Sequence, residues 1–63
     1  MKDIGLIGLG VMGRNLSLNI GNKGFSVAVF NMTSQKTKDF IENEVGKQDI
    51  TGYYDIKSFV ESL

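Results

Sequence analysis

The sequence contains no cysteine and no histidine, and these two absences restrict the sites that it can form. Without cysteine no disulfide can stabilise the fold, and without either residue the common zinc sites lack their thiolate or imidazole ligands. A zinc domain is therefore excluded, and we expect no metal site. The absence of cysteine also agrees with a cytoplasmic protein, which is the location that we expect.

The sequence also lacks an excess of charge and a long apolar run. Seven lysine and arginine residues balance seven aspartate and glutamate residues, so no net charge attracts nucleic acid or an anionic membrane. No apolar stretch approaches the ~20 residues that a membrane helix requires. We expect neither nucleic acid nor a membrane as a partner.

The chain is short and has no proline that would mark a domain boundary. Its 63 residues can form one small domain at most. A chain of this size buries only about 60% of the surface that its unfolded form exposes. We therefore expect the chain to be poorly stable or to self-associate when it is isolated.

The first residues have the pattern of a strand followed by a helix. Residues 3–8 form a short apolar run closed by glycine, which is typical of a buried strand. From Val11 onward, Met12, Leu16 and Ile20 recur every four positions. This spacing predicts an amphipathic helix with those three side chains on its buried face.

A second strand and a second helix follow. Gly24 can end the first helix in a left-handed conformation, and the run FSVAVF at residues 25–30 predicts another buried strand. A strand, a helix and a strand in this order predict a right-handed parallel crossover. Thr33 or Ser34 can cap a helix that runs to about Val45. The apolar face expected for that helix consists of Phe40, Ile41 and Val45.

The remaining residues predict a weak third strand at 50–54 and a last helix capped by Asp55. The apolar face expected for that helix consists of Ile56, Phe59, Val60 and Leu63. The whole pattern is βαβαβα, the first three strands of a partial Rossmann-type, doubly wound parallel sheet of the α/β class. Because such a sheet needs further strands, we expect residues 1–63 to be the amino-terminal part of a dinucleotide-binding domain.

The strongest motif is the run Gly-Leu-Gly-Val-Met-Gly at residues 8–13, between the first strand and the first helix. In this context Gly8 permits a tight turn, Gly10 lets the backbone approach a pyrophosphate, and Gly13 lets the helix lie close to the strand. The amino-terminus of the helix presents free amides to the anion. The alternative is that the glycines serve only the turn and the packing. The residues expected to contact the dinucleotide are Gly8, Leu9, Gly10, Val11, Met12 and Gly13.

The end of the second strand favours NADP over NAD. NAD-binding members of this fold have an acidic residue there, which accepts hydrogen bonds from the ribose, whereas this chain has Asn31. An amide is neutral and can donate to a 2′-phosphate. Thr33 and Lys36 follow in the next loop and helix and add a hydroxyl and a positive charge. Alternatively, Thr33 only caps the helix and Lys36, like Lys38, is a solvated charge.

These segments together resemble the start of the 6-phosphogluconate dehydrogenases. The resemblance is carried by GLGVMGRNLSLNI at residues 8–20, GFSVAVFN at residues 24–31, Thr33 and the pair Lys36-Thr37. It implies NADP-linked oxidative decarboxylation of 6-phosphogluconate to ribulose 5-phosphate and carbon dioxide by a cytoplasmic homodimer. This reaction belongs to the pentose phosphate pathway and to gluconate utilization. The resemblance also implies that residues 8–13 and 31–33 contact NADP.

Met32 departs from the pattern of that family, which usually has an arginine that stacks on the adenine and pairs with the 2′-phosphate. Methionine keeps an apolar surface for the adenine but lacks the bidentate charge. We therefore expect Lys36 to carry more of the recognition of the 2′-phosphate.

The resemblance places the acid, the base and the sugar-phosphate ligands of the family in later segments, so we expect no catalytic residue in this chain. Tyr53 and Tyr54 could donate protons, but the weak third strand favours a packing or surface role for both. Two alternatives stay open: a β-hydroxyacid dehydrogenase of the same superfamily, and a nucleotide-sensing module without redox chemistry.

Overall fold

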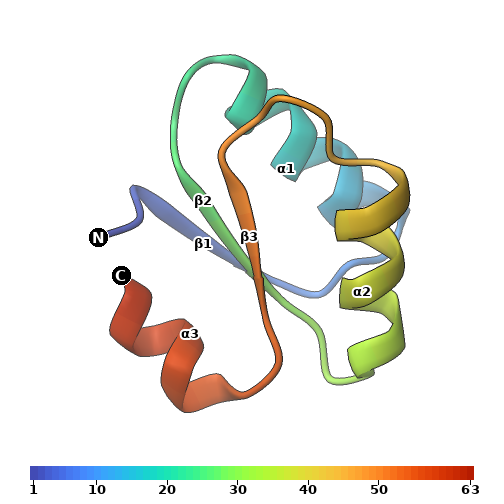
Figure 1. Ribbon diagram of the computed structural model, residues 1–63, viewed down its shortest axis with the longest axis vertical. Helices are drawn as coiled ribbons and strands as arrows, with labels where there is room; N and C mark the ends of the chain where they lie inside the picture. The colour runs from blue at the N-terminus through green and yellow to red at the C-terminus, as the bar shows by residue number, and fades with distance from the viewer.

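Three strands and three helices alternate along the chain, as the sequence pattern predicts (Figure 1). The computed structural model describes residues 1–63. The elements are β1 (Ile4–Ile7), α1 (Val11–Asn22), β2 (Val27–Phe30), α2 (Ser34–Asn43), β3 (Ile50–Tyr53) and α3 (Ile56–Ser62). None of the helices has the length and apolar character needed to cross a membrane.

The strands form one parallel sheet in the order β1-β2-β3, with Val27 paired to Ile4 on one side and to Ile50 on the other. Each strand is connected through a helix to its direct neighbour, and both connections run in the same direction across the sheet. Right-handed crossovers then place α1 and α2 on the same face of the sheet, whereas α3 lies on the opposite face (Figure 1). All four residues of β2 are buried because the strand has a neighbour on each side and helices above and below it. The predicted α/β fold is confirmed.

Two apolar clusters fill the space between the sheet and its helices. Under α1 and α2, the buried cluster consists of Leu9, Val27, Val29, Phe40 and Ile50. Under α3, it consists of Ala28, Phe30 and Phe59. Alternate residues of β2 therefore supply the two cores, since successive side chains of a strand point to opposite faces.

The prediction for the buried face of α1 was right for Ile20, which packs against the core cluster, and wrong for Met12 and Leu16. Met12 is 86% exposed and Leu16 is 49% exposed, whereas Ser17 and Gly21 are buried. Gly13, Ser17 and Gly21 recur every four positions and form a stripe of small residues that allows the helix to approach the sheet closely. The Ser17 hydroxyl donates to the Gly13 carbonyl at 2.8 Å, so its burial leaves no unpaired polar group. Close approach, rather than apolar bulk, decides which face of α1 is buried.

The predicted apolar face of α2 is confirmed. Phe40 is buried, and Ile41 and Val45 pack against the same cluster. Thr33 occupies the N-cap position, but its side chain makes no capping hydrogen bond. The helix ends at Asn43, two residues before the expected end. The backbone amide of Val45 still donates to the carbonyl of Phe40, which keeps Val45 against the core.

The cap predicted for α3 is confirmed, but most of its predicted apolar face is exposed. The Ser58 amide donates to the Asp55 carboxylate at 2.8 Å, and this bond lowers the pKa of Asp55. Only Phe59 is buried, at 3% exposure, against the rings of Phe30 and Tyr53. Val60 is 58% exposed. Leu63, just after the helix, is 41% exposed and lies with Phe59 close to Gly5 of β1.

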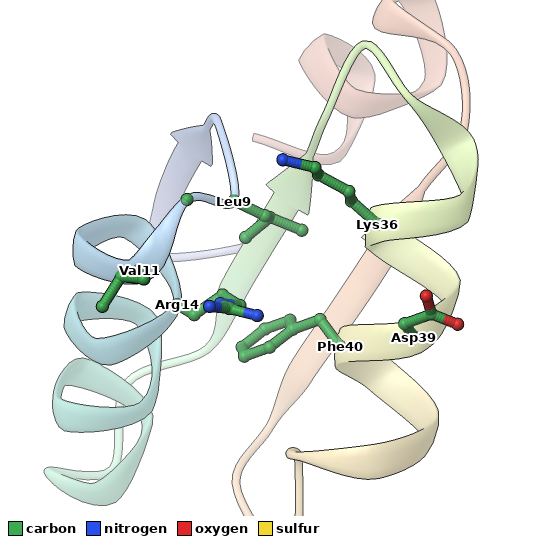
Figure 2. Close-up of a pocket in the computed structure, with 7 residues that line it drawn as sticks. Leu9, Val11, Arg14, Lys36, Asp39 and Phe40 are labelled. Atoms are coloured by element: carbon green, nitrogen blue, oxygen red, sulfur yellow. The ribbon is translucent and has the colours of Figure 1, made fainter.

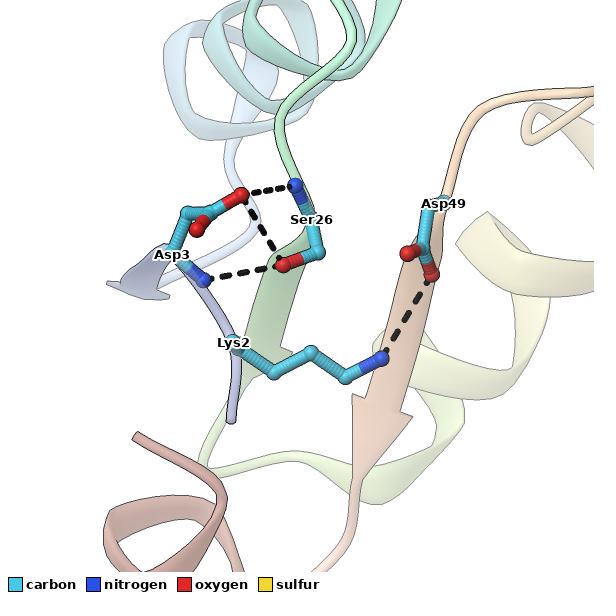
Figure 3. A network of polar contacts seen from close by, with 4 residues as sticks. All are labelled: Lys2, Asp3, Ser26 and Asp49. Atoms are coloured by element: carbon cyan, nitrogen blue, oxygen red, sulfur yellow. Dashed lines mark hydrogen bonds and ion pairs between the residues drawn. The ribbon is translucent and has the colours of Figure 1, made fainter.

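A polar network joins the amino ends of the three strands (Figure 3). The glycine loop lies at the other end of the strands. The Asp3 amide donates to the Ser26 hydroxyl at 2.9 Å, and the Ser26 amide donates to the Asp3 carboxylate at 2.8 Å. Lys2 reaches Asp49 at 3.4 Å. The bonds from Ser26 lower the pKa of Asp3. A lowered pKa in the folded state means that this contribution to stability is present above the ordinary pKa and is lost as the pH falls.

We expect Phe59→Ala to lower the free energy of unfolding of the chain by about 3 kcal/mol or more, because it leaves a cavity under α3. Val60→Ala, on the exposed side of the same helix, should change that free energy by less than about 0.5 kcal/mol. Urea unfolding followed by circular dichroism measures both. Equal losses for the two variants would show that α3 is not anchored through Phe59.

Candidate functional site

The glycine loop at the carboxyl end of β1 is held by the end of β2. The Gly8 amide donates to the Phe30 carbonyl at 2.9 Å, which continues the ladder between the two strands. The Leu9 amide donates to the Asn31 side-chain oxygen at 2.8 Å, and the Leu9 side chain is buried in the core. The turn after β1 and the turn after β2 therefore form one connected structure.

The three glycines of the loop have different physical reasons for lacking a side chain. Gly8 has φ of 99°, a left-handed conformation that other residues rarely adopt. A Cβ at Gly13 would overlap the Gly8 carbonyl oxygen. Gly10 has φ of −70° and ψ of −176°, an ordinary extended conformation, and a Cβ there would meet no atom within 4 Å. The fold requires glycine at positions 8 and 13, whereas nothing within the chain requires it at position 10.

The space above Gly10 lies at the amino-terminus of α1. Gly10 is the N-cap residue and provides no capping side chain, and the first turn of the helix contains no acidic residue. The first bond of the helix runs from the Arg14 amide to the Gly10 carbonyl at 3.0 Å. The amides of residues 10–13 have no acceptor within the chain. Free amides together with the positive end of the helix dipole stabilise a bound anion.

Asn31 has a structural role that the sequence did not predict. Its side-chain oxygen accepts the Leu9 amide, and its Nδ2 donates to the Thr33 carbonyl at 3.3 Å. The Leu9 amide is therefore not free for a ligand. One hydrogen of the Asn31 amide group is still available to donate, because the group carries two.

A cavity of about 220 Å³ opens between the glycine loop and α2 (Figure 2). The residues that line it are Leu9, Gly10, Val11, Arg14, Lys36, Asp39 and Phe40. The cavity thus joins half of the predicted loop to Lys36, whereas Met32 and Thr33 do not line it. Met32 is 87% exposed and carries an uncharged side chain.

Arg14 is a charged residue of this cavity that the sequence did not single out as a binding residue. It lies in the first turn of α1 and extends toward α2, where its Nη1 is 3.3 Å from the Glu44 carboxylate. Lys36 enters the cavity from α2 and forms no ion pair. The only signal in the sequence was the position of Arg14 directly after Gly13. That position says nothing about α2 until the two helices are placed side by side.

A family model for the NAD-binding domain of 6-phosphogluconate dehydrogenase matches residues 3–63. The chain belongs to that family. It is 52% identical over 62 residues to the NADP(+)-dependent, decarboxylating 6-phosphogluconate dehydrogenase of Bacillus subtilis (strain 168). It is 48% identical to the decarboxylating enzyme of Salmonella typhimurium over 62 residues and to that of Chlamydia pneumoniae over 61 residues.

These alignments cover 97–98% of the chain but 13% of each relative. The predicted resemblance to this family is therefore confirmed. A nicotinamide dinucleotide as the ligand class follows from the family and agrees with the free amides of the loop.

The packing role expected for Tyr53 agrees with its position in the structure. Tyr53 packs edge-on against Phe59, and no group of three His, Cys, Asp or Glu residues is placed to hold a metal ion. The residues around the cavity can bind and orient a charged ligand.

We expect Gly13→Ala to destabilise the chain by about 2 kcal/mol. Replacing a helical glycine gains about 1 kcal/mol, but overpacking against the Gly8 carbonyl costs about 3 kcal/mol. Gly10→Ala should cost less than about 1 kcal/mol, because only a modest N-cap preference is lost. Urea unfolding compares the two. A stabilised Gly13→Ala chain would contradict the close contact between α1 and the loop.

Proposed function

We propose that this chain is the amino-terminal part of the cofactor-binding domain of an NADP-dependent 6-phosphogluconate dehydrogenase. In the intact protein it would bind NADP, and the remaining segments would supply the sugar-phosphate site and the catalytic residues. The substrate, the cytoplasmic location and the homodimer belong to this proposal and follow from the family resemblance. The proposal rests on one observation above all: the open space at Gly10, beside amides that no group of the chain uses.

The residues present fit a diphosphate. If the glycines served only the fold, Gly10 would need a special conformation or a close neighbour, and it has neither. A side chain at this position would project into the space next to the free amides, where a diphosphate has to approach within hydrogen-bond distance. We therefore assign the pyrophosphate of the cofactor to the amides of residues 10–13. Gly8 and Leu9 position these amides, because Gly8 forms the turn and Leu9 is bonded to Asn31.

Four features support NADP over NAD. Position 31 carries no negative charge, so no carboxylate repels a 2′-phosphate there. The Thr33 side chain is not used as a cap, and Lys36 is unpaired beside the glycine loop. The relative from Bacillus subtilis is named as NADP(+)-dependent. Met32 lies exposed at the same turn and can cover the adenine with its apolar side chain.

In the intact enzyme, NADP would supply the hydride acceptor for oxidation of the sugar acid. This chain binds and orients the cofactor in that step: the loop fixes the diphosphate, and Asn31 fixes the loop. The relatives described above are all named as decarboxylating 6-phosphogluconate dehydrogenases. This agreement favours that activity over a β-hydroxyacid dehydrogenase and over a nucleotide sensor.

We expect Gly10→Val in the intact protein to weaken NADP and NAD binding at least about tenfold, since the side chain blocks the approach of the diphosphate to the amides. Gly46→Ala, a glycine substitution remote from the loop, is the matched control and should bind like the wild type. Calorimetric titration measures affinity, and circular dichroism checks that the fold is kept. Unchanged binding by a folded Gly10→Val protein would remove the assigned diphosphate site.

We expect the intact protein to reduce NADP in the presence of 6-phosphogluconate and to release carbon dioxide. The absorbance of the reduced nicotinamide follows the reaction, with 3-hydroxyisobutyrate as the comparison substrate. Turnover of the hydroxyacid alone would favour the β-hydroxyacid dehydrogenase. Binding of NADP without turnover of either compound would favour a nucleotide sensor.

A further inference from the structure

We propose that Arg14 binds the 2′-phosphate of NADP together with Lys36, and that Glu44 weakens this binding by competing for Arg14. The inference rests on the proposed function, because it assigns one part of the same cofactor. It goes beyond that function by placing a specificity residue on α1, outside the loop that follows β2.

The geometry brings two cations to one cavity from two different helices. Arg14 belongs to the first turn of α1 and Lys36 to the first turn of α2, and both line the cavity whose other wall is the glycine loop. Figure 2 shows the Lys36 side chain reaching toward Leu9 and the Arg14 side chain reaching toward α2. A ligand group in this cavity can therefore meet both positively charged side chains.

The rest of the cavity does not cancel these charges. Leu9 and Phe40 are apolar and buried, so they form an uncharged floor. Asp39 is the one acidic residue of the lining, and its carboxylate points away from Arg14 (Figure 2). The Gln35 side-chain amide donates to that carboxylate at 2.8 Å and holds it on the outer surface of α2. The cavity therefore presents more positive than negative charge to a ligand.

The ion pair between Arg14 and Glu44 is of the kind that a phosphate can replace. The two side chains are 36% and 37% exposed and meet through one contact of 3.3 Å. Exposed pairs of this type contribute little to stability because water screens them. A phosphate offers several charged oxygens, which a guanidinium binds through two parallel hydrogen bonds. We therefore expect a bound phosphate to displace Glu44 from Arg14.

The proposal also explains how NADP can be recognised although position 32 carries methionine. The uncharged, exposed Met32 side chain supplies no cation to the turn after β2. Arg14 and Lys36 supply two cations from the adjacent helix starts instead.

The test compares the affinities of the intact protein for NADP, NAD and 2′,5′-ADP by calorimetric titration. Arg14→Met keeps the length of the side chain and removes its charge. We expect it to weaken NADP and 2′,5′-ADP about tenfold and NAD by less than about twofold. Arg14→Lys should fall between the wild type and Arg14→Met, because it keeps the charge without the bidentate geometry. Glu44→Gln should tighten NADP and leave NAD unchanged.

Lys38→Met is the matched control, because it removes one charge from α2 at a position outside the cavity. It should change the ratio of NADP to NAD affinity less than Arg14→Met does. Equal weakening of NADP and NAD by Arg14→Met, or no change in either, would overturn the proposal. If the wild-type protein binds neither dinucleotide, the proposed function itself fails. If the wild type binds both and only the Arg14 variants leave the ratio unchanged, this inference alone fails.

Discussion

The arrangement of the site depends on the close approach of α1 to the end of β1. Gly13 makes this approach possible, because any side chain there would overlap the carbonyl of Gly8. Gly8 in turn adopts a left-handed conformation that starts the helix directly above the strand. As a result the first amides of α1 face outward at the carboxyl edge of the sheet, without a cap and without an acidic neighbour. The anion site is therefore a consequence of packing between backbones.

Asn31 extends this constraint to the second strand. Its side chain accepts the Leu9 amide and donates to the Thr33 carbonyl, so the loop after β1 and the turn after β2 cannot move independently. These two segments would contact the diphosphate and the adenosine of the same dinucleotide. A rigid link between them fixes in advance the distance between the two halves of the site, which reduces the ordering cost of binding.

The order of the strands and helices was predictable because local sequence patterns determine it. Apolar runs, the glycines at positions 8 and 24 and the Asp55 cap act over a few residues. The glycines and the cap lie where the sequence placed them, whereas β2 begins at Val27, two residues after the predicted start, and Phe25 is exposed. The buried face of α1 was not predictable from apolar spacing, since the contact with the sheet selects small residues such as Ser17 and Gly21. The predicted roles of Gly8 in the turn and of Gly13 in the close packing agree with the geometry of the loop, whereas the role of Gly10 toward a pyrophosphate stays a prediction. The cavity with Arg14 and Lys36 could not be predicted, because it requires the relative placement of two helices.

The most direct test of this account is a crystal structure of the intact protein with NADP. The account predicts that oxygens of the diphosphate lie about 3 Å from the amide nitrogens of residues 10–13, a normal hydrogen-bond distance. It also predicts that no protein side chain lies between Gly10 and the diphosphate. A diphosphate held mainly by side chains, or bound away from the start of α1, would contradict it.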